Sequence, residues 1–310
     1  MDVMNKVNDL GMALYTIDRK KDVGPLADAD RIKGAVSTYY DAAAAAAWRG
    51  EMWNWGMHDD VVRREISEII PAHGEQGSDG LSEQLYFFTI RKVPITFNDY
   101  SARRVLEVGC GLGDGLYFIS RILNSGSLVG LDLSPTAIQS ATARFGRNNI
   151  QFLRGDAERL PFHDREFDVV INVESSHTYP DLGKFIAEVG RVLKPGGYFS
   201  HVDLFTRERY QSMALLKQSP CGLQWLSEQD VSEKVKASIA KRMAPDSFLK
   251  KLHRSRQASA QTPQPQREMH ELYLEVMYGV SFLTGGDHAA TADSSPLPID
   301  RYCHSLARKL

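Results

Sequence analysis

The chain has 310 residues, of which 43% are hydrophobic and 25% charged, so it can bury a sizeable core in one or two globular domains. Its formal net charge of -2 gives no basic excess, which argues against a nucleic-acid substrate. Three widely spaced cysteines favour a reducing, cytoplasmic compartment over a disulfide or zinc framework, and no apolar run predicts a leader or a membrane span.

The N-terminal third predicts helices around an aromatic cluster. Residues 1–35 are polar and mixed and predict irregular structure or short helices, whereas the six alanines of 42–47 favour a helix. Segment 53–60 gathers two tryptophans, a methionine and a histidine around one glycine. It is either a hydrophobic staple that holds the N-terminal helices to the core or a lid over an active site. With a further helix at 81–94, we expect a helical cap over residues 1–95.

From residue 103 the pattern alternates between apolar strands and helical segments. Such alternation predicts an α/β fold with a Rossmann-like, doubly wound and mostly parallel sheet, placed at 96–205. The expected strands cover 103–109, 127–133, 150–153, 167–174 and 198–204, and the expected helices include 113–123, 182–193 and one capped by Ser134 with Pro135 at its first position.

The rest of the chain is less regular. Helical patterning at 222–253 and 268–278 predicts a helical cap inserted at 206–298, interrupted by a low-complexity stretch at 255–267. The last residues, 299–310, are expected to return to the core as a final strand.

A glycine-rich turn follows the first predicted strand. Glu107 precedes Gly109, Gly111 and Gly113, which can adopt positive φ and allow a ligand to lie against the main chain. The dinucleotide fingerprint G-x-G-x-x-G needs a glycine at its sixth position, and with Gly109 as the first position the sixth is Asp114. A nicotinamide-dependent oxidoreductase is therefore disfavoured.

Asp132 ends the second predicted strand, 23 residues after Gly109. The carboxyl ends of neighbouring parallel strands share one crevice, so this carboxylate is expected beside the glycine turn, where it can accept both hydroxyls of a ribose. The alternative is a structural acid at the start of the next helix. Together with the glycine turn, the pattern favours the ribose role.

The acid followed by G-x-G-x-G, in register with Gly155-Asp156-Ala157 after the third strand, resembles the class I S-adenosylmethionine-dependent methyltransferases over residues 100–205. The resemblance implies S-adenosylmethionine as cofactor and S-adenosylhomocysteine as product, with Asp156 accepting from the adenine amino group and Ala157 N–H reaching a ring nitrogen. It predicts no metal. The cofactor-binding residues expected from the pattern are Glu107, Gly109, Gly111, Gly113, Asp132, Leu133, Asp156, Ala157 and Asn172.

The segment after the fourth strand resembles that of small-molecule methyltransferases. Asn-Val-Glu-Ser-Ser-His-Thr-Tyr-Pro at 172–180, with the stretch 185–199, is similar to the phthiotriol/phenolphthiotriol dimycocerosate O-methyltransferases. The Asn/Asp-Pro-Pro-aromatic motif of nucleic-acid amino-methyltransferases is absent from this segment.

His177 in this segment is the expected general base, because histidine exchanges a proton near neutral pH. The alternative is a structural histidine bonded to a backbone carbonyl. Related sugar O-methyltransferases rely on the second of two adjacent histidines, and Thr178 takes that place here. Other candidates for the base are His58, His163, His201 and Tyr179.

The sequence thus predicts a methyltransferase acting on a hydroxyl of a small, largely apolar, natural-product or lipid-like acceptor. A C- or N-methyltransferase acting on a prenyl, sterol-like or amine substrate is the alternative. A regulatory cofactor-binding protein is a further rival, although the intact acids and His177 speak against it. The sequence leaves a homo-oligomer open. The expected acceptor-binding residues are Tyr40, Trp55, Tyr179, Trp225 and Tyr273.

Overall fold

The protein is described from a computed structural model. The predicted helix at 268–278 and Tyr273 lie outside the described residues. The structure describes residues 3–18, 28–47, 52–71, 78–124, 126–147, 149–257 and 299–310.

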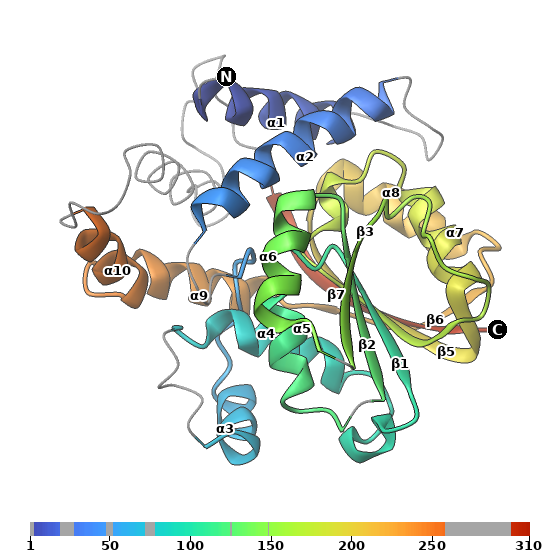
Figure 1. The fold of residues 1–310 in the computed structure, drawn as a ribbon. Coiled ribbons are helices and arrows are strands. Elements are labelled where there is room, and N and C mark those ends of the chain that lie inside the picture. Colours follow the sequence, from blue (N-terminus) through green and yellow to red (C-terminus); the bar gives the residue numbers. More distant parts are fainter. Residues whose placement is uncertain are drawn as a thin grey trace.

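The described residues form one seven-stranded sheet with the strand order β3-β2-β1-β4-β5-β7-β6 (Figure 1). Neighbouring strands from β3 to β5 are parallel, and β7 runs antiparallel to both β5 and β6. The predicted doubly wound, mostly parallel sheet is confirmed. The strands are β1 Arg104–Val108, β2 Ser127–Asp132, β3 Ile150–Arg154, β4 Phe167–Val173, β5 Leu193–Thr206, β6 Leu223–Asp230 and β7 Ile299–Lys309.

Strand β6 corrects the helix predicted from residue 222 onward. Its register places Leu223 opposite Lys309 and Asp230 opposite Cys303 of β7, so its backbone groups are paired in the sheet. Leu223 is buried and the other residues of β6 are exposed or half-buried, as expected of a strand at the edge of the sheet. Pairing with β7, which is distant in sequence, makes this segment a strand, and a local sequence pattern contains no information about such a partner.

Helices cover both faces of the sheet (Figure 1). One apolar cluster joins α4, α5 and α9 to one face, and another joins α7 and α8 to the opposite face. Along β1, Val105 faces the first cluster and Leu106 the second, as the twofold repeat of a strand requires. The helices are α1 Val3–Asp18, α2 Ala29–Ala46, α3 Asp60–Ile69, α4 Leu81–Arg91, α5 Asp114–Ser120, α6 Pro135–Phe145, α7 Leu182–Val192, α8 Arg207–Gln218, α9 Ser232–Met243 and α10 Phe248–Gln257, with 3-10 turns at Phe97–Tyr100 and Ser176–Thr178.

Helices α1 and α2 form an N-terminal pair across the edge of the sheet where β1 to β4 end (Figure 1). The helix expected from the alanine tract is confirmed as the end of α2, but the first residues form a longer helix than predicted. Leu10 and Ile17 of α1 pack with Ile32 and Tyr39 of α2. The apolar residues of this stripe repeat about every seven positions and have polar residues between them, so the composition of the segment alone does not indicate it.

Local signals set the start of α6 correctly. Ser134 Oγ accepts a hydrogen bond from Ala137 N–H at 3.0 Å, and Pro135 occupies the first turn. None of the helices in the described part of the chain is long and apolar enough to cross a membrane. The cytoplasmic location, a homo-oligomer and the division into domains stay predictions.

Candidate active site

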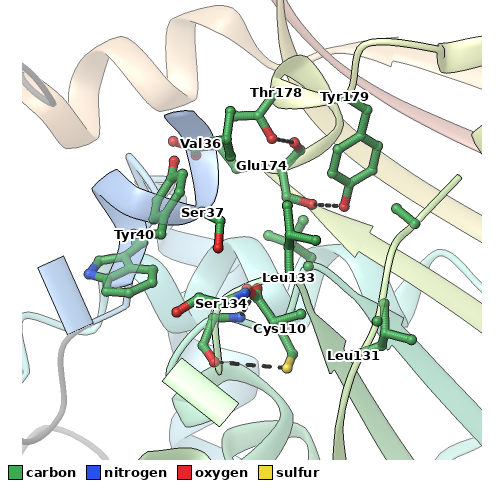
Figure 2. A pocket seen from close by; sticks show the side chains of 18 of the residues that line it. Val36, Ser37, Tyr40, Cys110, Leu131, Leu133, Ser134, Glu174, Thr178 and Tyr179 are labelled. Atoms are coloured by element: carbon green, nitrogen blue, oxygen red, sulfur yellow. Dashed lines mark hydrogen bonds between the residues drawn. The ribbon is translucent and has the colours of Figure 1, made fainter. Parts of the chain in front are cut away.

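A cavity lies where β1, β2 and β4 end, next to α2. It holds about 930 Å³ of space, counting the part open to solvent. Tyr40 and Tyr179 stand on opposite sides of this space (Figure 2). Ligands of open α/β sheets bind at this edge of the sheet. The predicted cofactor residues that line the cavity are Gly109, Gly111, Asp132, Leu133, Asp156 and Ala157.

The glycine turn is held tightly between β1 and the residues after β4. Gly109 has a φ of 77°, and a Cβ atom there would lie 2.1 Å from Ser175 Oγ. Its N–H donates to Leu131 O at 2.7 Å, which fixes the turn against β2. Gly113, at the start of α5, was predicted to bind the cofactor but is not among the lining residues. A Cβ atom there would clash with Phe152 of β3. It therefore serves close packing of α5 on the sheet.

Asp132 lies beside this turn, as the strand order predicts. Its Oδ2 accepts from Gly111 N–H at 2.8 Å and its Oδ1 from Ser134 N–H at 2.9 Å. Burial raises the pKa of Asp132 and the backbone hydrogen bonds oppose that shift. A carboxylate oxygen accepts two hydrogen bonds, so each oxygen retains capacity for one ribose hydroxyl. The structural and the ligand-binding interpretations of Asp132 are thus compatible.

Asp156 is tied to helix α2 by a lysine that sequence reasoning missed. Lys33 Nζ lies 2.7 Å from Asp156 Oδ2 and 2.6 Å from Glu158 Oε2. Burial lowers the pKa of Lys33, but its two carboxylate partners outweigh burial and raise it overall. Lys33 lies 123 positions before Asp156, so only the fold reveals the pair.

We expect Lys33→Ala to speed dissociation of S-adenosylhomocysteine on the order of tenfold, since a hydrogen bond to a charged group contributes about 1.5–3 kcal/mol. The lost contacts would loosen α2 over the cavity. Stopped-flow fluorescence measures the rate. Arg31→Ala on the same helix is the matched control, because its pair with Asp28 is exposed and worth little. Equal rates in Lys33→Ala and wild type would contradict this role.

Glu107 and Asn172 lie behind the cavity wall and are not among its lining residues. Tyr86 donates its hydroxyl to Glu107 Oε1 at 2.7 Å, and burial raises the pKa of Glu107 to about 8. Asn172 Nδ2 lies 2.7 Å from Ser175 Oγ and 3.2 Å from the Tyr179 hydroxyl. Tyr86, Ser175 and Tyr179 do line the cavity. The two predicted residues therefore position side chains that reach the cavity.

His177 sits in the 3-10 turn after β4 and pairs with Asp203 of β5. Its Nδ1 lies 2.8 Å from Asp203 Oδ1, and its backbone N–H donates to Asp203 Oδ2 at 3.0 Å. Burial lowers the pKa of His177, but the charge and hydrogen bond of Asp203 outweigh burial and raise it. His177 is not among the cavity-lining residues, and neither are His58, His163 or His201. Its role as base stays a prediction.

The His177 ring should titrate above its usual pKa of about 6.5, and Asp203→Asn should lower the midpoint, because burial and Arg209 are then opposed only by the charge of Glu174. Histidine-ring NMR measures this, with His177→Gln identifying the resonance. The ion pair stabilises the fold most between about pH 4 and pH 6.5. Its contribution is lost as pH rises through the raised pKa of His177 or falls through the lowered pKa of Asp203. An unchanged midpoint in Asp203→Asn would contradict the pairing.

The aromatic residues predicted for acceptor binding separate into two groups. Tyr40 and Tyr179 line the cavity, together with Trp53, whose ring centroid lies 5.2 Å from that of Tyr40. Trp55 is only 8% exposed, belongs to the core and is not among the lining residues. Trp225 packs against the α7 and α8 face, away from the cavity. Segment 53–60 thus supplies both a residue that lines the cavity and a residue of the core, and a lid stays a prediction.

The second predicted cap does not reach the cavity within the part of the chain that is described. None of residues 207–257 lines it. Helix α9 packs on the face of α4, and α8 packs on the opposite face. The part of the cavity wall that comes from residues 1–95 consists of residues of α2, Met52, Trp53 and Tyr86 of α4. Within the described ranges, no group of His, Cys, Asp or Glu side chains is arranged to hold a metal ion.

Comparison with known proteins identifies the family. A methyltransferase domain family matches residues 106–201. The probable phthiotriol/phenolphthiotriol dimycocerosates methyltransferase 2 of Mycobacterium ulcerans is 43% identical over 188 residues, which are 60% of this chain and 68% of that protein. The fatty-acid O-methyltransferase of Mycolicibacterium smegmatis is 40% identical over 157 residues, 51% of this chain and 53% of that protein. The chain spans 65% of the phthiotriol/phenolphthiotriol dimycocerosates methyltransferase of Mycobacterium leprae.

A solved structure agrees with the fold. The crystal structure of the [4+2]-cyclase SpnF matches with a TM-score of 0.60 at 18% identity, over 89% of this chain and 95% of that chain. One fold hosts different reactions, so this likeness speaks for architecture alone. By the domain match and the 43% identity, the chain belongs to the class I S-adenosylmethionine-dependent methyltransferases.

Proposed function

We propose that this chain transfers the methyl group of S-adenosylmethionine to a hydroxyl of a lipid-like acceptor. The observation that carries the proposal is the cavity in which the glycine turn, Asp132 and Asp156 meet at one edge of the sheet. Relatives named for phthiotriol and fatty-acid methylation support the lipid-like acceptor.

The residues present fit the cofactor. Asp132 would hold the ribose hydroxyls, and Asp156 with the backbone of Ala157 would meet the adenine. Gly109 and Gly111 of the turn line the cavity, so the remaining part of the molecule would lie against them. The neutral glycine backbone places no bulky side chain in the way of a ligand.

The acceptor side of the cavity is largely apolar. Val36 and Tyr40 of α2 lie on it with Met52 and Trp53. Such a wall binds hydrocarbon by removing it from water, and it excludes water that would compete for the methyl group. Bound S-adenosylmethionine supplies an electrophilic methyl group on a sulfonium, so the chain must orient the acceptor oxygen and take its proton. The candidate proton acceptors after β4 are the predicted His177 and, from the structure, Glu174.

A matched panel of acceptors tests the proposed function: dodecan-1-ol, 4-dodecylphenol, dodecanoic acid and dodecylamine, each with methyl-labelled S-adenosylmethionine. Mass spectrometry identifies the product. We expect methyl ethers from one or both hydroxyl compounds. Methylation of the amine or at carbon would favour the alternative N- or C-transfer. Calorimetry with S-adenosylhomocysteine shows separately whether the cofactor site is intact.

A further inference from the structure

The residue that directly follows β4 in the cavity wall is Glu174. It is 5% exposed and lines the cavity, although the sequence pattern drew attention to His177 three positions later. Its φ is 50°, and Arg165 is the other non-glycine residue with positive φ among those described. Its N–H donates to Val202 O at 2.8 Å, which holds this strained backbone in place. Strained residues of this kind occur preferentially at functional sites.

The side chain of Glu174 presents one oxygen to the cavity. Trp55 N–H donates to Oε2 at 2.8 Å, and the Tyr302 hydroxyl donates to the same oxygen. No described residue donates a hydrogen bond to Oε1, and no described lysine or arginine pairs with the carboxylate. Oε1 is not among the fully buried unpaired atoms, so it is accessible from the cavity, where an acceptor hydroxyl would donate a hydrogen bond to it.

The surroundings of Glu174 suit proton transfer near neutral pH. Burial raises its pKa to about 7, against the hydrogen bonds from Tyr302 and Trp55 that favour the charged form. The charge of His177 also favours the anion, and Asp203 opposes it. Tyr40 faces Glu174 from α2, with its own pKa raised well above its usual value by burial. A base works best when its pKa is close to the working pH.

His177 is less suited to this step. It is not among the residues that line the cavity, and its Nδ1 is engaged by Asp203, whose charge and hydrogen bond raise the pKa of the ring above its usual value. The His177–Asp203 pair therefore has a positioning role, in which the His177 side favours the charged form of Glu174.

We propose that Glu174 accepts the proton of the acceptor hydroxyl. This inference rests on the proposed O-methylation. The acceptor oxygen forms the new C–O bond as the methyl–sulfur bond breaks, and the sulfur keeps that electron pair as a neutral thioether. The O–H proton passes to Glu174 Oε1, and the protonated carboxyl group later releases it to water.

Glu174→Gln tests the proposal, because it keeps the shape and can still accept from Trp55 and Tyr302. With whichever panel hydroxyl the wild type methylates, kcat should fall about 10²–10⁴-fold. Affinity for S-adenosylhomocysteine should stay within about threefold by calorimetry, as expected for a group that acts on the proton rather than on the cofactor. The acidic limb of the kcat/KM profile near pH 7 should disappear.

Two further variants separate proton acceptance from a structural role. Tyr302→Phe removes a donor that favours the charged form, so the acidic limb should move to higher pH with the high-pH rate retained. His177→Gln should also move the limb upward and lower kcat less than tenfold. If Glu174→Gln keeps its activity and limb while His177→Gln loses both, Glu174 is not the base.

Infrared difference spectroscopy measures the protonation of Glu174 directly, so it tests this proposal separately from the proposed O-methylation. In the wild-type complex with S-adenosylhomocysteine, a protonated-carboxyl band absent from Glu174→Gln should titrate near pH 7. A midpoint below about pH 5 would overturn the proposal even if methyl ethers form, since such a carboxylate is a weak base at neutral pH. A wild type that binds S-adenosylhomocysteine but methylates only dodecanoic acid overturns both, because that acceptor has no hydroxyl proton to lose at neutral pH.

Discussion

An Asp132→Ala variant is expected to bind S-adenosylhomocysteine about 5- to 150-fold more weakly than the wild type. The change removes the acceptor of two ribose hydroxyls in a half-buried site, and unpaired polar groups there cost about 1–3 kcal/mol. It also frees the N–H groups of Gly111 and Ser134, which Asp132 holds in the structure. Isothermal titration calorimetry measures the affinity, with circular dichroism showing that the protein is folded at the temperature used.

Two variants serve as controls for Asp132. Asp132→Asn keeps the shape and one acceptor oxygen, so its affinity should fall between those of Asp132→Ala and the wild type. Asp99→Ala removes an exposed carboxylate from the 3-10 turn Phe97–Tyr100, outside the cavity, and should leave affinity unchanged. Unaltered binding by Asp132→Ala would remove Asp132 from the cofactor site.

The parts of the fold that local chemistry determines could be predicted from the sequence. Apolar runs marked the central strands, and Ser134 with Pro135 marked the start of α6. The glycine turn and Asp132 meet because parallel strands end at one edge, a rule that requires no coordinates. Strand β6 was missed because its pairing partner β7 follows it by about 70 positions in the chain.

The sequence predicted only those cavity residues that lie at the ends of the parallel strands or directly after them. Asp132 ends β2 and Asp156 follows β3, and both line the cavity. Glu107 and Asn172 lie behind the lining residues, because the direction of their side chains takes them away from the cavity. Lys33 reaches the cavity through the packing of α2, which no motif marks. Glu174 was visible in the sequence, yet its importance comes from burial, positive φ and the donors on Oε2. These properties belong to the folded chain.

Replacing Arg242 by alanine is expected to cause a large loss of stability. Arg242 is 5% exposed, and its Nε and Nη2 bond the two carboxylate oxygens of Asp79 at 2.7 and 2.9 Å. It also donates to Asn54 O and Ser82 Oγ, so it joins α9 to the N-terminal segments. Breaking a buried pair leaves a charge without its partner, which costs about 3–5 kcal/mol. Urea unfolding at neutral pH measures the loss.

The pH dependence and a paired replacement identify the cause of this loss. Burial raises the pKa of Asp79, but Arg242 outweighs burial and lowers it. The pair therefore stabilises the fold above the unfolded pKa of about 3.9, and its contribution falls as pH drops through the lowered folded value. The double variant Arg242→Met with Asp79→Leu should recover part of the stability, because no unpaired charge remains. If the double variant is as unstable as the sum of the two single variants, the loss comes from packing and the ion pair is not its source.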